Sequence, residues 1–194
     1  MPATSVSFNL LATKVQIGRP IINLALPPVS SSWVLKLPSG TKLSAYAIND
    51  ENCHKSAFVG VDPGSRHMGL AIIDYGRIVV YEIEYQPKLQ TVEIVERTRE
   101  AIEYILDLDS INTACVEGAA FGAGFGQAKL SESKTAAVMT LLDIADRVFV
   151  VPPLSVYKEV FGSGKIKAKT YQPWSHIPKN AASALALAIY AERL

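Results

Sequence analysis

The sequence predicts an α/β domain, in which a mixed five-stranded sheet is flanked by helices, together with a small β extension at the N-terminus. Two observations lead to this prediction. Three strand-like segments follow one another directly from residue 57, and helix-like and strand-like segments then alternate towards residue 194. Closely spaced strands favour an antiparallel meander, whereas alternation with helices favours further strands in the same sheet.

Residues 1–56 form the predicted extension. The stretch KVQIGRPIINLAL indicates a strand over Val15–Leu26, and two prolines and a serine-rich turn follow it. The stretch SWVLKLPSGTKLSAYAI then alternates apolar and polar residues around Pro38-Ser39-Gly40, which is typical of a β-hairpin. The extension is therefore expected to be β-structured, and its residues indicate no function.

The segments of residues 57–194 predict five strands and three helices. Gly76 is expected to form the turn between the second and third strands. The second helix is expected to begin at Ser131 or Ser133, and Asn180 is a candidate N-cap for the third. In chain order the strands are AFVGVD, MGLAIID, IVVYEIEY, TACVE and RVFVVPP, and the helices are TVEIVERTREAIEYILDL, SESKTAAVMTLLDIAD and PKNAASALALAIYAERL.

The net charge of +1 conceals an uneven distribution. Residues 1–56 carry +3, residues 57–149 carry −6 and residues 150–194 carry +4. Basic flanks around an acidic centre permit binding to a polyanion such as DNA. The charge pattern alone does not demonstrate such binding.

The cellular location is expected to be a reducing one, and we favour the cytoplasm of a prokaryotic or viral system. Cys53 and Cys115 are too few for a disulfide framework or a zinc module. No apolar run reaches the length of a membrane-spanning helix. The first 49 residues contain no acid, as in a transit peptide, but the strand-like stretch within them argues against organellar targeting.

Two acidic residues stand at the ends of apolar strands. Asp62 ends AFVGVD and precedes Pro63-Gly64, and Glu117 ends TACVE and precedes a glycine. If the two strands are neighbours, the carboxylates converge at the sheet edge and repel one another unless a cation lies between them. Oxygen ligands suit Mg²⁺ or Mn²⁺. The alternative is that each is an ordinary solvated residue at a strand end.

Four ordered segments carry a resemblance to a known family. The stretch FVGVDPGSRHMGLAIID closely resembles the first motif of RuvC-type Holliday junction resolvases, which belong to the RNase H-like superfamily. The segments ACVEGAAFGAGFGQ and PPLSVYKEVFGSGKIKAK resemble that family's second motif and its later basic loop. The alanine-rich last helix lies where the family carries its final acidic residues. The resemblance covers residues 57–194, implies an RNase H-like nuclease domain there and leaves residues 1–56 unmatched.

The resemblance implies Mg²⁺-dependent phosphodiester hydrolysis, with Mn²⁺ as a substitute. Asp62 would bridge two metal ions, Glu117 would ligate one, and the last helix would supply two acids where this chain has Asn180 and Ser183. These neutral side chains remove two negative charges from the expected site. Three accounts stay open: substrate phosphate completes the coordination, the site binds DNA without cutting it, or an aspartate has been replaced. Asp143 and Asp146 could in principle compensate, but both lie in the preceding predicted helix and are expected at the surface.

The resemblance also suggests side chains that face DNA. Aromatic residues in the glycine-rich loop would stack on bases or wedge between them, and basic residues would contact phosphates. The alternatives are that the aromatics pack on the core and that the lysines form a solvated face. The candidates are Arg66, Phe121, Phe125, Lys129, Lys158, Lys165, Lys167 and Lys169.

The leading functional hypothesis is a structure-selective endonuclease that resolves four-way DNA junctions and acts as a homodimer, without membrane association. The second hypothesis is a relative that binds branched DNA without cutting it, because Asn180 and Ser183 replace the expected acids. A third is an RNase H-like nuclease acting on another nucleic acid.

Overall fold

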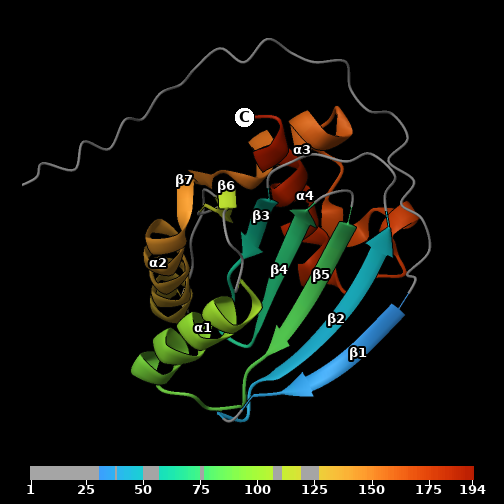
Figure 1. The fold of residues 1–194 in the computed structure, drawn as a ribbon. Coiled ribbons are helices and arrows are strands. Elements are labelled where there is room, and N and C mark those ends of the chain that lie inside the picture. Colours follow the sequence, from blue (N-terminus) through green and yellow to red (C-terminus); the bar gives the residue numbers. More distant parts are fainter. Residues whose placement is uncertain (1–30, 38, 50–56, 75–76, 107–110, 119–126) are drawn as a thin grey trace, which may run out of the picture.

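The strands of this chain form one seven-stranded sheet, in the order β1-β2-β5-β4-β3-β6-β7. The structure is a computed structural model that describes residues 31–37, 39–49, 57–74, 77–106, 111–118 and 127–194. Figure 1 shows a twisted sheet with β1 at one edge and β7 at the other. The predicted strand over Val15–Leu26 and the turn at Gly76 lie outside the described residues.

All five strands predicted within residues 57–194 are present. The meander consists of β3 (Ala57–Asp62), β4 (His67–Asp74) and β5 (Arg77–Glu84), which are antiparallel neighbours. Two further strands, β6 (Ile111–Glu117) and β7 (Ala145–Val151), add in parallel on the other side of β3. The expected mixed sheet is therefore confirmed.

The N-terminal extension contributes two strands to the same sheet. The predicted hairpin forms as β1 (Ser31–Lys36) and β2 (Lys42–Asn49), and β2 pairs antiparallel with β5 along its whole length. Gly40 adopts a φ of 87° in the turn, which is a conformation that glycine adopts without strain. The sheet thus continues from the predicted five strands into the extension.

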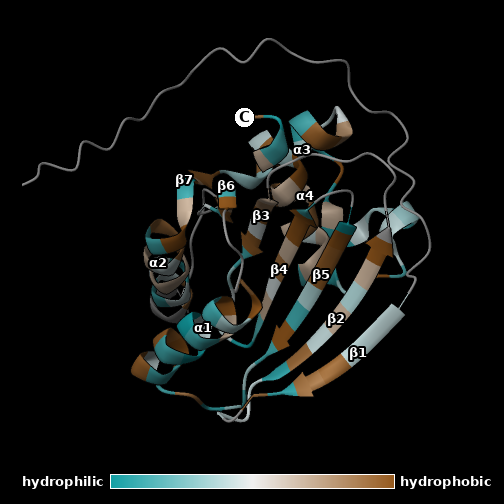
Figure 2. Cartoon of the chain, in the orientation of Figure 1, coloured by the Kyte–Doolittle hydropathy of each residue, from teal (hydrophilic) through white to brown (hydrophobic). Residues whose placement is uncertain are grey.

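Helices cover both faces of the sheet (Figure 1). One face carries α1 (Thr91–Ile105) and α2 (Gln127–Ile144), which pack on each other. The other face carries α4 (Lys179–Glu192), with α3 (Pro153–Phe161) and the short 3₁₀ turns η1 (Ala168–Thr170) and η2 (Gln172–Trp174) near it. Figure 2 shows brown, apolar strands between these layers and many teal positions on α1. No helix in the described part of the chain has the length and apolar character needed to span a bilayer.

The second helix begins earlier than predicted. It starts at Gln127, so neither Ser131 nor Ser133 is its N-cap. Ser133 is instead fully buried, and its hydroxyl lies 3.2 Å from that of Thr98 on α1. The Thr98 hydroxyl in turn lies 3.0 Å from the hydroxyl of Tyr85. Buried hydroxyls need such partners, which is why a serine is tolerated inside this helix.

Two glycines allow α4 to lie directly on the central strands. A Cβ on Gly60 of β3 would stand 2.0 Å from the carbonyl oxygen of Ala184, and one on Gly69 of β4 would stand 2.0 Å from that of Asn180. Glycine is thus required at both positions because the helix backbone occupies the space of a side chain. The small side chains of this alanine-rich helix serve the same close packing, and most of them are buried.

Candidate functional site

Asp62 and Glu117 end neighbouring strands. Val61 pairs with Val116 in the parallel ladder between β3 and β6, so the next residue of each strand lies at the same level of the sheet. Asp62 is 5% exposed, although it is an acid at a strand end. It is therefore not the solvated residue of the simpler interpretation. The ends of β3 and β6 therefore converge, as the sequence predicted.

The N-terminus of α4 lies over this edge. Asn180 is not the N-cap of the helix: Pro178 occupies that position, and Asn180 lies inside the first turn. Its side-chain amide donates a hydrogen bond of 2.9 Å to Glu82 on β5, and the backbone N–H of Ala181 donates one of 3.2 Å to the same carboxylate. A carboxylate from a strand thus satisfies a free N–H group of the helix and stabilises its N-terminus.

Ser183 lies one turn further along α4 and faces the acids. Its side chain is 1% exposed, and its hydroxyl lies near Asp62 and near Tyr157 of α3, where it opposes the rise that burial causes in the pKa of each group. The hydroxyl does not reach good hydrogen-bond geometry with either group. Position 183 therefore brings a neutral oxygen to the site where the family resemblance implies an acid.

Lys169 is the cation that the structure places against Asp62. Its ammonium nitrogen lies 2.8 Å from Oδ2 of Asp62. The pKa of Asp62 is nonetheless raised, because burial outweighs the attraction of Lys169. The pKa of Lys169 is raised as well, because the attraction of the two nearby carboxylates outweighs its own partial burial. The lysine is thus held in its charged form beside a buried acid.

The pKa of Glu117 depends on its burial, on the other acid and on two lysines. Burial, followed by repulsion from Asp62, raises the pKa of Glu117 to about 7. The ammonium groups of Lys169 and of Lys134 on α2 oppose this rise. Two carboxylates and two lysines therefore lie near one another at the ends of β3 and β6.

A pair of divalent ions does not fit this arrangement. Among the described residues, no group of three or more His, Cys, Asp or Glu side chains is placed to hold a metal ion. The Asn180 amide is bonded to Glu82, and the Lys169 ammonium lies on Asp62. Two carboxylates and a neutral hydroxyl supply less charge than a cage for two hard cations requires. The Mg²⁺ or Mn²⁺ cofactor implied by the resemblance is consequently not supported by the geometry.

The predicted DNA-facing residues fall into two groups. Arg66, Lys158, Lys165 and Lys167 are exposed, and Lys169 is half-buried at the site. Lys158 lies in α3 rather than in the basic loop. Phe121 and Phe125 and the side chain of Lys129 lie outside the described residues, so their predicted contacts stay predictions.

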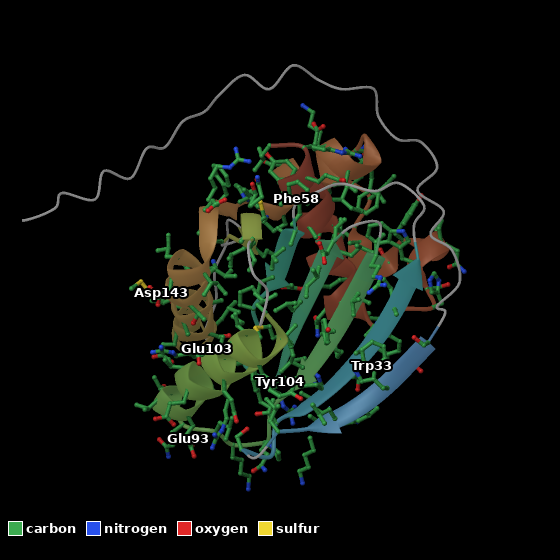
Figure 3. The ribbon with its side chains drawn as sticks, in the orientation of Figure 1. Trp33, Phe58, Glu93, Glu103, Tyr104 and Asp143 are labelled. Atoms are coloured by element: carbon green, nitrogen blue, oxygen red, sulfur yellow. The ribbon has the colours of Figure 1, made fainter. Side chains whose placement is uncertain are left out.

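The acids that could have compensated for Asn180 and Ser183 do not reach the site. Asp143 and Asp146 are both exposed, and Asp146 lies in β7 rather than at the end of α2. Figure 3 shows Asp143 on the outer side of α2, directed away from the sheet. Both are surface residues, as expected.

Sequence reasoning missed Glu82, Tyr157 and Lys134. Glu82 lies two residues before the end of the half-buried strand β5. It pairs with Gly69 of β4, which in turn pairs with Asp62 of β3. Counting residues along the meander would have placed Glu82 level with Asp62. No comparable signal marks Tyr157 or Lys134, because their positions depend on how α3 and α2 pack.

Solved structures that share this fold include two of RuvC from Thermus thermophilus. The first is T. thermophilus RuvC in complex with a Holliday junction substrate, with a TM-score of 0.55 and 18% sequence identity over 71% of this chain and 93% of that one. A second Thermus thermophilus RuvC structure gives a TM-score of 0.54 at the same identity and coverage. No family model and no curated protein matches the sequence. The chain therefore has a RuvC-like fold, which confirms the predicted RNase H-like architecture.

Replacing Glu117 with glutamine is expected to stabilise the protein at high pH. The folded pKa of about 7 lies above the ordinary value of 4.5, so the folded state binds the extra proton and loses stability as the pH rises through 7. We expect a gain of about 2 kcal/mol in the free energy of unfolding at pH 8 and less than half of that at pH 5. Urea denaturation at both pH values measures it.

Glu96 provides the matched control, because it is exposed on α1. The Glu96→Gln variant is expected to leave stability unchanged at both pH values. An equal gain in stability at pH 5 and pH 8 for Glu117→Gln would show that the folded state does not raise the pKa of Glu117.

Proposed function

We propose that this chain recognises branched DNA, and four-way junctions in particular, through the sheet edge that carries Asp62. The observation that supports this most is the arrangement of basic groups there. Lys165 and Lys167 are exposed, and neither forms an ion pair within the described part of the chain. Two residues after Lys167, Lys169 forms the ion pair with the buried Asp62. Exposed lysines beside a functional edge are suited to phosphate contacts.

The fold supports the same proposal. One structure that shares it was solved with a Holliday junction substrate, and the four ordered motifs of residues 57–194 resemble the junction resolvases. Within this proposal residues 57–194 form the DNA-facing domain, residues 1–56 are an extension of it, and the protein acts in the cytoplasm. As the site stands, we expect binding without cutting, because two of the expected acids are neutral and Lys169 lies on a third.

Junction cleavage is the second candidate function. The observation that favours it is the convergence of Asp62 and Glu117, where burial, followed by repulsion from Asp62, raises the pKa of Glu117. A divalent cation would relieve that repulsion and supply the Lewis acid for phosphodiester hydrolysis. On this account the chain would be a Mg²⁺-dependent endonuclease, and Asp62→Asn would abolish cutting while leaving binding nearly intact.

A homodimer is part of the proposal, because a four-way junction has two-fold symmetry and a two-fold dimer would match it. Met139 and Leu142, three residues apart on one face of α2, are exposed and apolar, and a second copy would cover them. Sedimentation of the full chain with and without Leu142→Glu measures this. An unchanged monomer in both cases would contradict the dimer.

Removing the basic side chains is expected to reduce the salt dependence of junction binding. Each phosphate that a lysine no longer neutralises lowers the slope of log affinity against log salt by roughly 0.9. We expect this change for Lys165→Ala and for Lys167→Ala, measured by fluorescence anisotropy on a synthetic four-way junction.

Arg77→Ala is the control, because Arg77 is exposed and begins β5 at the opposite end from Glu82 and the acids. It removes the same charge without touching the proposed surface. Equal slopes for the unsubstituted chain and all three variants would show that the two lysines lie on a solvated face and do not contact phosphates.

A further inference from the structure

The protein itself supplies cations that balance the charges of Asp62 and Glu117. Asp62 and Glu117 supply two carboxylates, and the ammonium groups of Lys169 and Lys134 both act on Glu117. The Glu82 carboxylate also acts on Asp62, and it accepts hydrogen bonds from the Asn180 amide and the Ala181 N–H. The neutral hydroxyls of Ser183 and Tyr157 face the acids as well. The two lysines match the charge of Asp62 and Glu117, so these two carboxylates attract a divalent ion less than a cage of four carboxylates would.

The position of Lys169 is fixed by its surroundings. It lies in the short turn η1, which packs against α4. The residue before it, Ala168, is buried, and Tyr171 and Trp174 after it form an aromatic cluster with Phe161 of α3. The ring centroids in this cluster are 4.8 to 5.5 Å apart. The backbone that carries the ammonium is therefore anchored in the core.

The contact between Lys169 and Asp62 is direct. The 2.8 Å separation is that of a close ion pair, and the carboxylate in it is almost fully buried. A buried carboxylate without its cation would be strongly destabilising. An ion that replaces the ammonium must therefore first break this pair.

We propose that the Lys169 ammonium is the resident cation of this site, and that a divalent ion binds to Asp62 and Glu117 only when Lys169 is removed. This inference rests on the proposed function, because its consequence is that junction binding does not require a divalent ion. Its test does not, because metal binding is measured on the free protein.

Titration of the free chain with Mn²⁺, followed by calorimetry and by thermal unfolding, tests the proposal. Lys169→Met keeps the length of the side chain and removes its charge, and Lys169→Arg keeps the charge. Arg77→Met is the control, because Arg77 is exposed and lies at the opposite end of β5 from the acids. We expect Lys169→Met to bind Mn²⁺ at least about tenfold more tightly than the unsubstituted chain and to gain thermal stability from it.

Lys169→Arg and Arg77→Met are expected to behave like the unsubstituted chain. Equal affinity of the unsubstituted chain and Lys169→Met, including no binding by either, would overturn the proposal. If Lys169→Met does not fold, Lys169→Gln takes its place with the same expectation. Absence of junction binding by the unsubstituted chain would contradict the proposed function and leave this result standing.

Discussion

Gly69→Ala is expected to cost at least about 3 kcal/mol in the free energy of unfolding, and to abolish junction binding in the protein that remains folded. The new Cβ would stand 2.0 Å from the carbonyl oxygen of Asn180 and 2.3 Å from its carbonyl carbon. These are backbone atoms of the first turn of α4, which cannot rotate away. The helix must lift from the sheet, and it carries Ser183 away from Asp62 when it does.

Gly164→Ala is the matched control for this prediction. A Cβ at Gly164 would meet nothing closer than 3.5 Å, and the backbone there does not require glycine. Urea denaturation of the two variants should therefore give a large loss for Gly69→Ala and almost none for Gly164→Ala. Equal stability of the two variants would show that α4 does not lie as close to β4 as described.

Asn180→Asp is expected to destabilise the protein by about 2 to 3 kcal/mol at neutral pH. The amide of Asn180 donates its hydrogen bond to Glu82, so an aspartate there would set one carboxylate against another. The pKa of Glu82 is already raised by burial, and Asp62 raises it further. Restoring one of the acids of the family pattern therefore damages this chain.

Glu82→Gln in the same chain is expected to rescue the loss. The new amide would donate to the aspartate at position 180, which restores the hydrogen bond with donor and acceptor exchanged. A double-mutant cycle on the free energy of unfolding measures the coupling, with an expected value of about 2 kcal/mol. Additive effects of the two substitutions would contradict the contact between Asn180 and Glu82.

The sheet and its acid pair were predictable from local patterns. Alternation and short apolar runs located all five strands of residues 57–194, and acids at the ends of AFVGVD and TACVE indicated a shared edge. A charged residue that ends a buried strand is poorly explained by packing, so its position carries information. Parallel pairing of β3 with β6 then brought Asp62 and Glu117 to the same level.

What surrounds the acid pair depended on packing between distant elements, and there the sequence was insufficient. Asn180 matched an N-cap by residue type, but the approach of α4 to Gly69 placed its amide on Glu82, 98 positions away in sequence. The place of Trp174 in the aromatic core positions Lys169, and no local pattern in the sequence indicates that packing. The start of α2 differs from the prediction because Ser133 is buried against Thr98 instead of capping the helix.

A synthetic four-way junction, compared with a linear duplex of equal length, tests the central claim most directly. Binding and strand cleavage are measured on both, with and without Mn²⁺. The account predicts that the junction binds at least about tenfold more tightly than the duplex, with the same affinity in either buffer and no cut strand. Equal affinity for junction and duplex would contradict junction recognition, and cleavage in Mn²⁺ would contradict a site whose cation is Lys169.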